Sequence, residues 1–273
     1  MDNSWQYISS KSNPLLVRLA KLKDKKYRRA EGLFRFDGIK LFLEAAQFGA
    51  PVEYVLVSES ASQKYCSEVD ERVGNAKRYI VSDDAFAKLT DELSPEGIIT
   101  VCSSLDNIAS CDNYDALAKE IADKTVLVLE SVRDTGNMGT IIRSARAFGV
   151  DCLIVSSDCA DLYNSKTIRA AMGALFTQRI VVVDSVVDTV EAIKNNGSRV
   201  FAAALDNNAR KLGSFELVNG DAIVIGNEGH GLARETIDSC SECVFIPMES
   251  DSESLNAGIA ASICMWELYK IKN

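Results

Sequence analysis

Three stretches of the chain place side chains that could do chemistry directly after runs of strand-forming residues. The first follows residues 125–129, where two glycines bracket Asn137 and where Arg143 and Arg146 lie three positions apart. This spacing predicts that the strand turns into a helix capped by Asn137, with both guanidinium groups on one helical face. An amide and two cations are then available at the carboxyl end of a strand. An ordinary capped helix with surface arginines fits the spacing equally well.

The second stretch follows residues 222–225 and reads Gly226-Asn-Glu-Gly-His-Gly231. Its three glycines let backbone amides and carbonyls approach a ligand closely, and Glu228 lies among them as a hydrogen-bond acceptor or counter-charge. The pattern is neither the G-x-G-x-x-G of a dinucleotide site nor a Walker loop, which would need Lys and Ser or Thr. His230 is expected to be an exposed loop residue rather than a base.

The third stretch begins with a strand-like run at residues 243–246, which ends at Ile246-Pro247 and leads into an acidic loop. Ser254 and Asn256 then precede a run of small residues that lets a helix pack closely against a neighbour. The alternative for Ser254 is a helix N-cap, and the alternative for the small residues is ordinary core packing.

The elements that must position these loops alternate between strands and helices. Runs rich in strand-forming residues recur at residues 125–129, 152–155, 179–183, 199–203, 222–225 and 243–246. Such alternation predicts a parallel sheet covered on both faces, with the ligand site at the carboxyl ends of its strands. The three stretches therefore belong to one α/β domain at residues 125–273.

A smaller α/β domain is predicted at residues 1–104, joined to the larger one by a linker at residues 105–124. Asn13-Pro14 is a typical helix start, and leucines then recur at helical spacing. Strand-like and helical runs alternate from there to a strand predicted at residues 97–101. The segment that follows is polar and shows little apolar periodicity, which is the reason for interpreting it as a linker. Two domains also suit a length of 273 residues.

The charge of the chain is unevenly distributed. A net charge of −9 at first argues against a nucleic-acid partner, because phosphate contacts dominate such binding. Between Lys11 and Lys40, however, only Asp24, Glu31 and Asp37 are acidic. The basic residues there are Lys11, Arg18, Lys21, Lys23, Lys25, Lys26, Arg28, Arg29, Arg35 and Lys40. One end is therefore basic, as expected if a local patch meets RNA, although a solvated helix face would carry the same charges.

The composition is that of an ordinary globular protein, with 47% hydrophobic and 25% charged residues. No apolar run approaches the roughly 18 residues that a membrane span needs, and the N-terminus has no export or organelle signal, so we expect a cytoplasmic location. The cysteines mostly adjoin apolar residues, which predicts buried thiols in a reducing compartment. Cys240-Ser-Glu-Cys243 has no second pair, and His230 is the single histidine, so we expect no metal site.

Together the three stretches resemble a known family. Asn137-x-Gly139-x-x-x-Arg143, Gly226-Asn-Glu-Gly229 and Ile246-Pro-Met with Ser254-Leu-Asn256 look like the three ordered motifs of the SpoU, or TrmH-like, RNA ribose 2′-O-methyltransferases. Residues 165–176 are also similar to the family, and the basic N-terminal domain resembles the substrate-binding domain of members that act on ribosomal RNA. The chain departs from the family at Thr135, where Pro is usual, and at Ser250 or Asp251, where a Gly is usual.

The resemblance implies an α/β fold with a trefoil knot, a homodimer in which both subunits build each site, and S-adenosylmethionine as cofactor. It implies methyl transfer to a ribose 2′-hydroxyl of structured RNA, with large-subunit (23S) ribosomal RNA as the preferred substrate. Three alternatives stay open: a transfer RNA substrate, methylation of a base, and a non-catalytic RNA-binding assembly factor of the same fold.

The resemblance also implies roles for individual residues. The catalytic set is Arg143, Asn137, Glu228, Ser254 and Asn256. The cofactor-binding set is Gly226, Asn227, Gly229, Ile246, Met248, Leu255 and Ala204. The RNA-binding set is Lys11, Arg18, Arg28, Arg29, Arg35, Arg146 and Arg169. A ribose hydroxyl must lose its proton, but a guanidinium is effectively always charged, so we expect Arg143 to orient the ribose and contact an RNA phosphate.

Overall fold

The computed structural model describes residues 4–90, 92, 94–206, 208–249 and 254–271, which divide into two compact units. The N-terminal unit comprises Met1–Asp106 with Tyr163–Phe176, and the C-terminal unit comprises Asn107–Leu162 with Thr177–Asn273. Both units are α/β, as the sequence predicted. No helix in the described residues combines the length and the apolarity that crossing a membrane requires.

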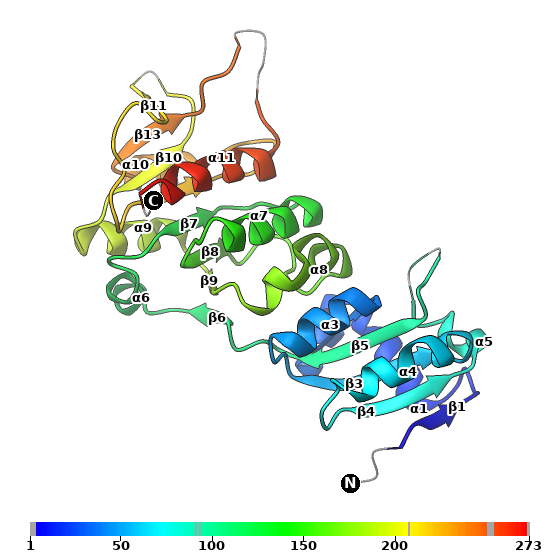
Figure 1. Cartoon of the computed structure of the whole chain (residues 1–273). Helices are drawn as coiled ribbons and strands as arrows, with labels where there is room; N and C mark the ends of the chain where they lie inside the picture. The colour runs from blue at the N-terminus through cyan, green and yellow to red at the C-terminus, as the bar shows by residue number, and fades with distance from the viewer. Residues whose placement is uncertain (1–3, 91, 93, 207, 250–253, 272–273) are drawn as a thin grey trace. The chain divides into compact units, whose positions relative to one another are not determined.

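Figure 1 shows the order of the elements along the chain. The strands are β1 (Gln6–Ile8), β2 (Leu33–Asp37), β3 (Val52–Ser58), β4 (Lys77–Val81), β5 (Ile98–Ser103), β6 (Ile108–Cys111), β7 (Val126–Leu129), β8 (Cys152–Ser156), β9 (Ile180–Val183), β10 (Val200–Ala203), β11 (Arg210–Lys211), β12 (Ala222–Ile225) and β13 (Glu242–Phe245). The helices are α1 (Pro14–Ala20), α2 (Lys25–Glu31), α3 (Ile39–Gln47), α4 (Ser62–Asp70), α5 (Asp83–Phe86), α6 (Tyr114–Glu120), α7 (Thr135–Ala147), α8 (Ser165–Ala171), α9 (Val186–Asn195), α10 (Arg234–Ser239) and α11 (Ala257–Tyr269). Short 3-10 turns are η1 (Lys21–Lys23), η2 (Glu59–Ala61) and η3 (Met172–Phe176).

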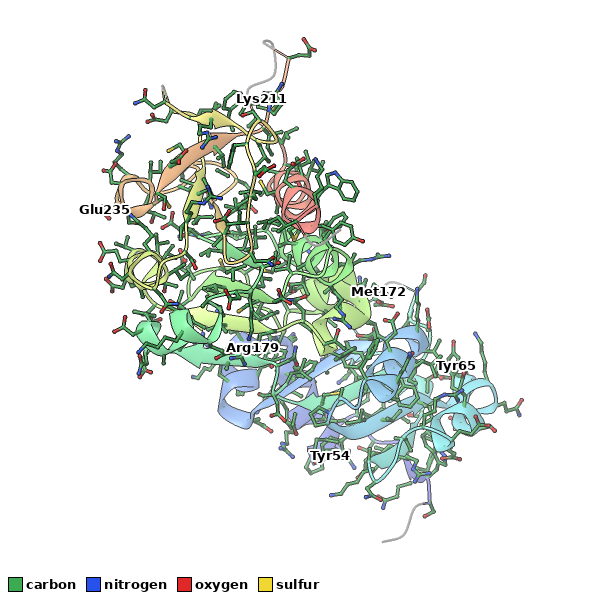
Figure 2. The ribbon with its side chains drawn as sticks, turned by 60° about the vertical axis from the view of Figure 1, so that its left-hand side comes forward. Tyr54, Tyr65, Met172, Arg179, Lys211 and Glu235 are labelled. Atoms are coloured by element: carbon green, nitrogen blue, oxygen red, sulfur yellow. The ribbon has the colours of Figure 1, made fainter. Side chains whose placement is uncertain are left out.

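The N-terminal unit is built on a five-stranded sheet of order β1-β4-β3-β5-β2. β1, β4 and β3 are parallel, whereas β5 runs antiparallel to both β3 and β2. Side chains of β3 alternate between two cores: Leu56 joins the leucines of α1 and η1, and Val55 joins Tyr65 of α4 on the other face. Tyr54, next to Val55, packs against the first core, and Figure 2 labels both tyrosines.

The first helix begins where the sequence predicted. Asn13 is its N-cap, and the Asn13 side chain accepts a hydrogen bond of 2.9 Å from the backbone N–H of Leu15. Pro14 occupies the first helical position, where the missing N–H costs nothing. Leu16 and Leu19 are then buried on one face, so the opposite face of α1 is left to solvent.

Residues 163–176 pack with the N-terminal unit, although their position in the sequence predicts that they belong to the larger domain. The Tyr163 ring stacks on Phe34 of β2 with 4.4 Å between centroids, and Arg169 of α8 forms an ion pair of 2.6 Å with Glu92. Apolar stacking against β2 thus draws a segment from the middle of the chain into the first unit.

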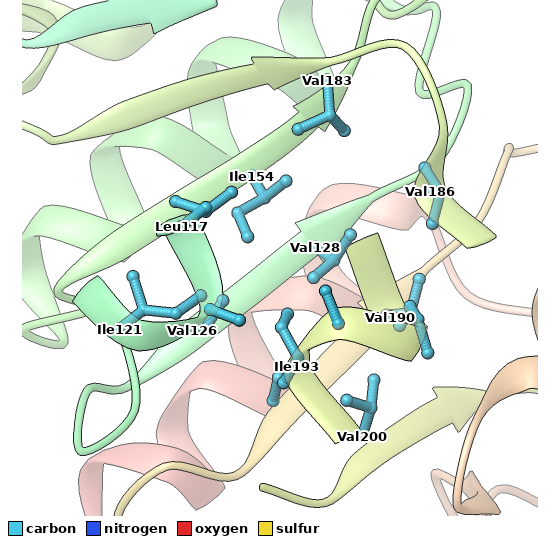
Figure 3. Close-up of a cluster of buried hydrophobic side chains, with 14 of the residues drawn as sticks. Leu117, Ile121, Val126, Val128, Ile154, Val183, Val186, Val190, Ile193 and Val200 are labelled. Carbon is cyan, nitrogen blue, oxygen red and sulfur yellow. The ribbon is translucent and has the colours of Figure 1, made fainter. Parts of the chain in front are cut away.

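The C-terminal unit is built on an eight-stranded sheet of order β11-β13-β10-β12-β7-β8-β9-β6, in which every neighbouring pair of strands is parallel. All six strands predicted for this part of the chain are present, within a residue or two at their ends. Val126 and Val128 of β7 face a core shared with α6 and α9, which Figure 3 shows in close-up. Leu127 and Leu129 point to the opposite face of the sheet, where α7 and α11 lie side by side (Figure 1).

The predicted linker at residues 105–124 contains β6 and α6, which belong to the C-terminal unit. β6 pairs in parallel with β9 at the edge of the sheet, and α6 packs against α9. Arg179, which precedes β9, reaches Glu120 at the end of α6 with a 3.1 Å ion pair (Figure 2 labels Arg179). The segment is therefore structural in the C-terminal unit.

The cysteines are free thiols, and most of them are buried, as predicted. Burial raises the pKa of Cys152, Cys240 and Cys264 to about 12, which keeps these side chains protonated at neutral pH. Within the described residues, no three His, Cys, Asp or Glu side chains are grouped so that they could hold a metal ion.

Candidate active site

The loops that follow β7 and β12 lie next to each other because these two strands are neighbours in the parallel sheet. The backbone N–H of Glu130 donates to the carbonyl of Ile225, so the pairing continues to the last residue of each strand. Neighbouring parallel strands end at the same edge, which brings the first and second predicted motifs together.

The first motif forms the start of α7, with one difference from the prediction. Asp134, not Asn137, is the N-cap: its carboxylate accepts a 2.7 Å hydrogen bond from the backbone N–H of Asn137. A carboxylate is a strong cap because it also balances the positive end of the helix. Asn137 therefore lies inside the first turn, and its side-chain amide is available for contacts outside the helix.

The Asn137 side chain joins the second motif to the third. Its Nδ2 donates to Oε1 of Glu228 at 2.9 Å, and its Oδ1 accepts from Nδ2 of Asn256 at 2.9 Å. Oδ1 of Asn256 in turn caps α11 by accepting from the N–H groups of Gly258 and Ile259. The chain of Glu228, Asn137 and Asn256, which we call the motif bridge, connects one residue from each of the three motifs.

The Glu228 carboxylate is held in its ionised form. Partial burial acts to raise the pKa of Glu228, but hydrogen bonds from the Asn137 amide and from the backbone N–H groups of Arg133 and Asp134 outweigh it, so this pKa lies below its ordinary value. The two backbone contacts are long, at 3.4 Å each. An acceptor with a fixed negative charge is therefore present at neutral pH.

The glycine-rich loop folds back on itself. Asn227 and Gly231 exchange two backbone hydrogen bonds of 3.0 Å, and Oδ1 of Asn227 accepts from the N–H groups of Gly229 and His230 at 2.8 and 3.1 Å. A Cβ on Gly226 would lie 2.3 Å from the carbonyl carbon of Gly231, so only glycine fits there. The side chain of Asn227 holds the loop itself, and His230 is exposed, as expected.

A cavity of about 150 Å³ lies beside the third motif. Four residues of the predicted cofactor set line it, and so does Ser254 of the catalytic set; the four are Ala204, Ile246, Met248 and Leu255. Gly226, Asn227 and Gly229 do not line this cavity. Ser254 is exposed, and the N-cap of α11 is Asn256, so the alternative role of Ser254 as that cap is excluded.

The small residues of the third motif allow α11 to pack closely on α7. A Cβ on Gly258 would lie 3.5 Å from the side-chain oxygen of Asn137, and Ser262 donates a 3.0 Å hydrogen bond to Ser144. On the same α7 helix, Arg143 and Arg146 are exposed, and neither guanidinium forms an ion pair or hydrogen bond with another described residue. Both cations are therefore available to an external anion.

Two residues of the predicted RNA-binding set are structural. Arg28 is 7% exposed and donates to the carbonyls of Leu22 and Lys23, and Arg35 is 7% exposed and donates to the carbonyl of Leu89. This corrects the prediction, because buried guanidinium groups that donate hydrogen bonds to backbone carbonyls are not accessible to RNA. The other five members are exposed: Lys11, Arg18, Arg29, Arg146 and Arg169. Of these, Lys11, Arg18 and Arg169 form ion pairs with Asp84, Glu31 and Glu92.

A polar cluster around Ser131, directly after β7, was not predicted from the sequence. Ser131 has a left-handed backbone (φ 55°), its N–H donates to Ser156 at 2.8 Å, its hydroxyl donates to Asp158 at 2.5 Å, and its carbonyl accepts from Asn227 at 2.8 Å. Asp158 also accepts from the Arg133 guanidinium at 3.1 Å. The signal was present, because Ser156 ends β8 and Asp158 follows it at the same edge of the sheet.

Two family models match the chain. The SpoU rRNA Methylase family matches residues 124–266, and the MRM3-like substrate binding domain matches residues 13–100. The chain belongs to the SpoU rRNA methylase family. This confirms the predicted class of enzyme, an S-adenosylmethionine-dependent RNA 2′-O-methyltransferase, and the predicted two-domain α/β architecture.

Named proteins are similar to this chain over most of its length. The 23S rRNA (guanosine(2553)-2′-O)-methyltransferase RlmP of Bacillus subtilis is 29% identical over 263 residues, which covers 96% of this chain and 98% of the relative. A putative TrmH family tRNA/rRNA methyltransferase of Staphylococcus aureus is 31% identical, covering 83% of this chain and 92% of the relative. The SpoU methyltransferase AviRb from Streptomyces viridochromogenes, solved in complex with the cofactor AdoMet, is similar with a TM-score of 0.81 and 26% identity, covering 95% of this chain and 98% of AviRb.

Proposed function

We propose that this protein transfers a methyl group from S-adenosylmethionine to a ribose 2′-hydroxyl of 23S ribosomal RNA in the cytoplasm. The observation that carries the proposal is the motif bridge, which joins Glu228, Asn137 and Asn256 at the carboxyl edge of the parallel sheet. Similarity to RlmP over 96% of the chain supports ribosomal RNA as the substrate. The name of the S. aureus relative keeps transfer RNA as the alternative substrate.

The cavity beside the third motif fits part of the cofactor. Its lining is mainly apolar, from Ala204, Ile246, Met248 and Leu255, which suits a flat ring such as adenine. At about 150 Å³ it is smaller than the roughly 300 Å³ at which pockets begin to enclose whole ligands, so it would hold one part of the cofactor. When bound, S-adenosylmethionine supplies an activated methyl group on a sulfonium.

The chain's own residues position the ribose and manage its proton. A hydroxyl is a weak nucleophile until its proton leaves, so the reaction needs orientation and a nearby negative charge. Glu228 offers such a charge and Asn137 fixes its direction. Arg143 stays charged and has no described partner, so it would pair with a phosphate of the RNA and align the ribose next to it.

We infer a homodimer, and the apolar outer face of α11 supports this inference. A helix with one buried face normally has a polar opposite face, but here Ile259 is 53% exposed and Trp266 is 46% exposed, with the half-buried Ile263 between them at helical spacing. The Phe148 ring at the end of α7 extends this face, 5.9 Å from Trp266 between centroids. A second copy of the chain would cover this apolar surface.

Light scattering tests the dimer. It should show a monomer for Trp266→Lys and a dimer for the control Val218→Lys, which changes another exposed apolar residue.

The test of the activity is methyl transfer from tritiated S-adenosylmethionine to 23S ribosomal RNA, followed by nuclease mapping of the labelled nucleotide. RNA from a strain that lacks the gene provides an unmethylated substrate. We expect one labelled ribose 2′-O position and loss of transfer in Arg143→Ala, with Arg72→Ala as the control for removal of an exposed arginine.

Three results would contradict the proposal in different ways. Label in transfer RNA alone would establish the alternative substrate. Label on a base would establish another reaction. Cofactor binding without transfer to any RNA, free or in ribosomal particles, would favour a non-catalytic assembly factor.

A further inference from the structure

The N-terminal unit carries a groove of about 420 Å³ that is lined by residues from two stretches of the chain, 11–24 and 85–89. Four lysines line it: Lys11, Lys21, Lys23 and Lys88. Apolar residues also line it, and they include Val17, which is 44% exposed. Asp24 is the one carboxylate among the lining residues. All of these residues belong to the N-terminal unit.

The groove concentrates positive charge on a chain that is strongly acidic overall, with a net charge of −9. Lys23 and Lys88 are exposed, and neither forms an ion pair with any residue that the structure describes. Lys21 lies over the ring of Tyr27, 5.5 Å from its centroid, and Lys11 pairs with the exposed Asp84 at 2.5 Å. An exposed ion pair of this kind is weak, so Lys11 can exchange Asp84 for an external anion.

Lysines of this arrangement suit the RNA backbone rather than base edges. An ammonium binds a phosphate as a point charge from any direction, whereas a planar guanidinium or amide is better suited to the bidentate contacts that read base edges. The exposed side chain of Val17 offers an apolar surface to a ribose or a base between two phosphates. The volume lies within the range of about 300–1,000 Å³ in which small molecules bind, which is room for about one nucleotide.

We propose that the lysine groove binds the sugar–phosphate backbone of the substrate RNA and positions it without reading its sequence. The inference rests on the proposed function for the identity of the RNA. It replaces the broad basic face predicted from the sequence with a defined surface, since Arg28 and Arg35 are buried and Lys88 lies outside the basic N-terminal stretch.

The experiment compares two double variants of the full chain that remove the same charge. Lys23→Gln with Lys88→Gln changes the groove, and Lys64→Gln with Lys77→Gln changes exposed lysines of the same unit that do not line it. Filter binding to transcripts of 23S and 16S ribosomal RNA is measured over a series of KCl concentrations. The groove variant should bind both transcripts several-fold more weakly, and its slope of log affinity against log salt should fall by about 0.7–0.9 for each lost phosphate contact.

Catalysis provides the second readout. The groove variant should raise KM for RNA and leave kcat unchanged, because the groove contributes equally to binding before and during the reaction. Thermal unfolding checks that both variants fold. If the wild-type protein binds RNA through the groove but transfers no methyl group, the proposed function is refuted. The proposal that the groove binds RNA is then unaffected.

Other outcomes would overturn the proposal that the groove binds the RNA backbone. Equal weakening by the control variant would mean a diffuse electrostatic effect, and unchanged binding by the groove variant would mean that RNA docks elsewhere. A loss for 23S RNA alone would mean that the groove reads sequence. Unchanged RNA binding with lost binding to vesicles of phosphatidylserine and phosphatidylcholine would assign the groove to a lipid surface.

Discussion

Replacing Asn137 with Ala should slow methyl transfer strongly while leaving the protein folded. The change removes a hydrogen bond to the charged Glu228, worth about 1.5–3 kcal/mol when buried, and a neutral one to Asn256, worth about 0.5–1.5 kcal/mol. Because Glu228 and Asn256 are exposed and Asn137 is only half-buried, we discount the total to about 2–3 kcal/mol. If the bridge acts in the transition state, kcat/KM falls roughly 30- to 150-fold, at about 1.4 kcal/mol per factor of ten.

The assay is a double-mutant cycle on kcat/KM for RNA. Asn256→Ser keeps an oxygen that can cap α11 but removes the amide that donates to Asn137, so it isolates the bridge from helix capping. The two changes together should cost less than the sum of each alone, with a coupling of about 0.5–1.5 kcal/mol. Asn195→Ala, at an exposed position at the end of α9, is the control.

The Asn137→Ala variant should also change the pH dependence. Loss of the Asn137 donor raises the pKa of Glu228 toward its ordinary value, so the acid limb of kcat/KM moves to higher pH. An Asn137→Ala protein within twofold of wild type, or strict additivity with Asn256→Ser, would refute the bridge as a catalytic arrangement and reduce it to a local packing feature.

Three further results are expected. Gly226→Ala should lower stability by about 1–3 kcal/mol in thermal unfolding, because its Cβ would meet backbone at 2.3 Å, whereas Gly229→Ala should be neutral, since its nearest contact would be 3.5 Å away. Asp221→Asn should cost about 3 kcal/mol in urea unfolding, because this buried carboxylate, 1% exposed, pairs with Arg199 at 2.5 Å; a loss below 1 kcal/mol would contradict the pairing. The pKa of Glu228 is lowered in the folded state, so the ionised side chain stabilises the protein above the ordinary carboxyl pKa, and this contribution disappears as the pH falls through the folded pKa. Glu228→Gln should therefore remove this part of the acid dependence of stability. A curve of stability against pH that is unchanged in the variant would contradict this expectation.

Much of the C-terminal unit was predictable because the central strands of its sheet are largely unbroken apolar runs. Residues 222–225 are Ala-Ile-Val-Ile and form β12 between two covered faces, which is what a buried parallel strand requires. The rule that ligands lie at the carboxyl ends of such strands then selected Asn137 and Glu228. Their hydrogen bond joins them as that rule implied.

The failures at β6 and Arg35 share one cause: a contact distant in sequence decided the outcome. Ile108–Cys111 is short and has mixed polarity, and it becomes β6 because β9 offers it an edge to pair with. In the sequence, Arg35 adds one positive charge like any other arginine. In the structure, however, β2 is buried and the Arg35 guanidinium donates a hydrogen bond to the carbonyl of Leu89. The sequence predicts Asn137 as the N-cap of α7, but Asp134, three residues earlier, occupies that position. The knot and the cofactor geometry stay predictions.

The motif bridge also has a consequence for protein synthesis. It joins positions 91 and 119 residues apart, and Asn256 leaves the ribosome last of the three. At 5–20 residues per second, Asn256 is added roughly 1 to 6 seconds after Glu228. A nascent or prematurely terminated chain that stops before Asn256 can complete β7 and β12 but lacks the amide that closes the bridge and the cap that starts α11. We therefore expect competence for methylation to arrive only when α11 has been synthesised.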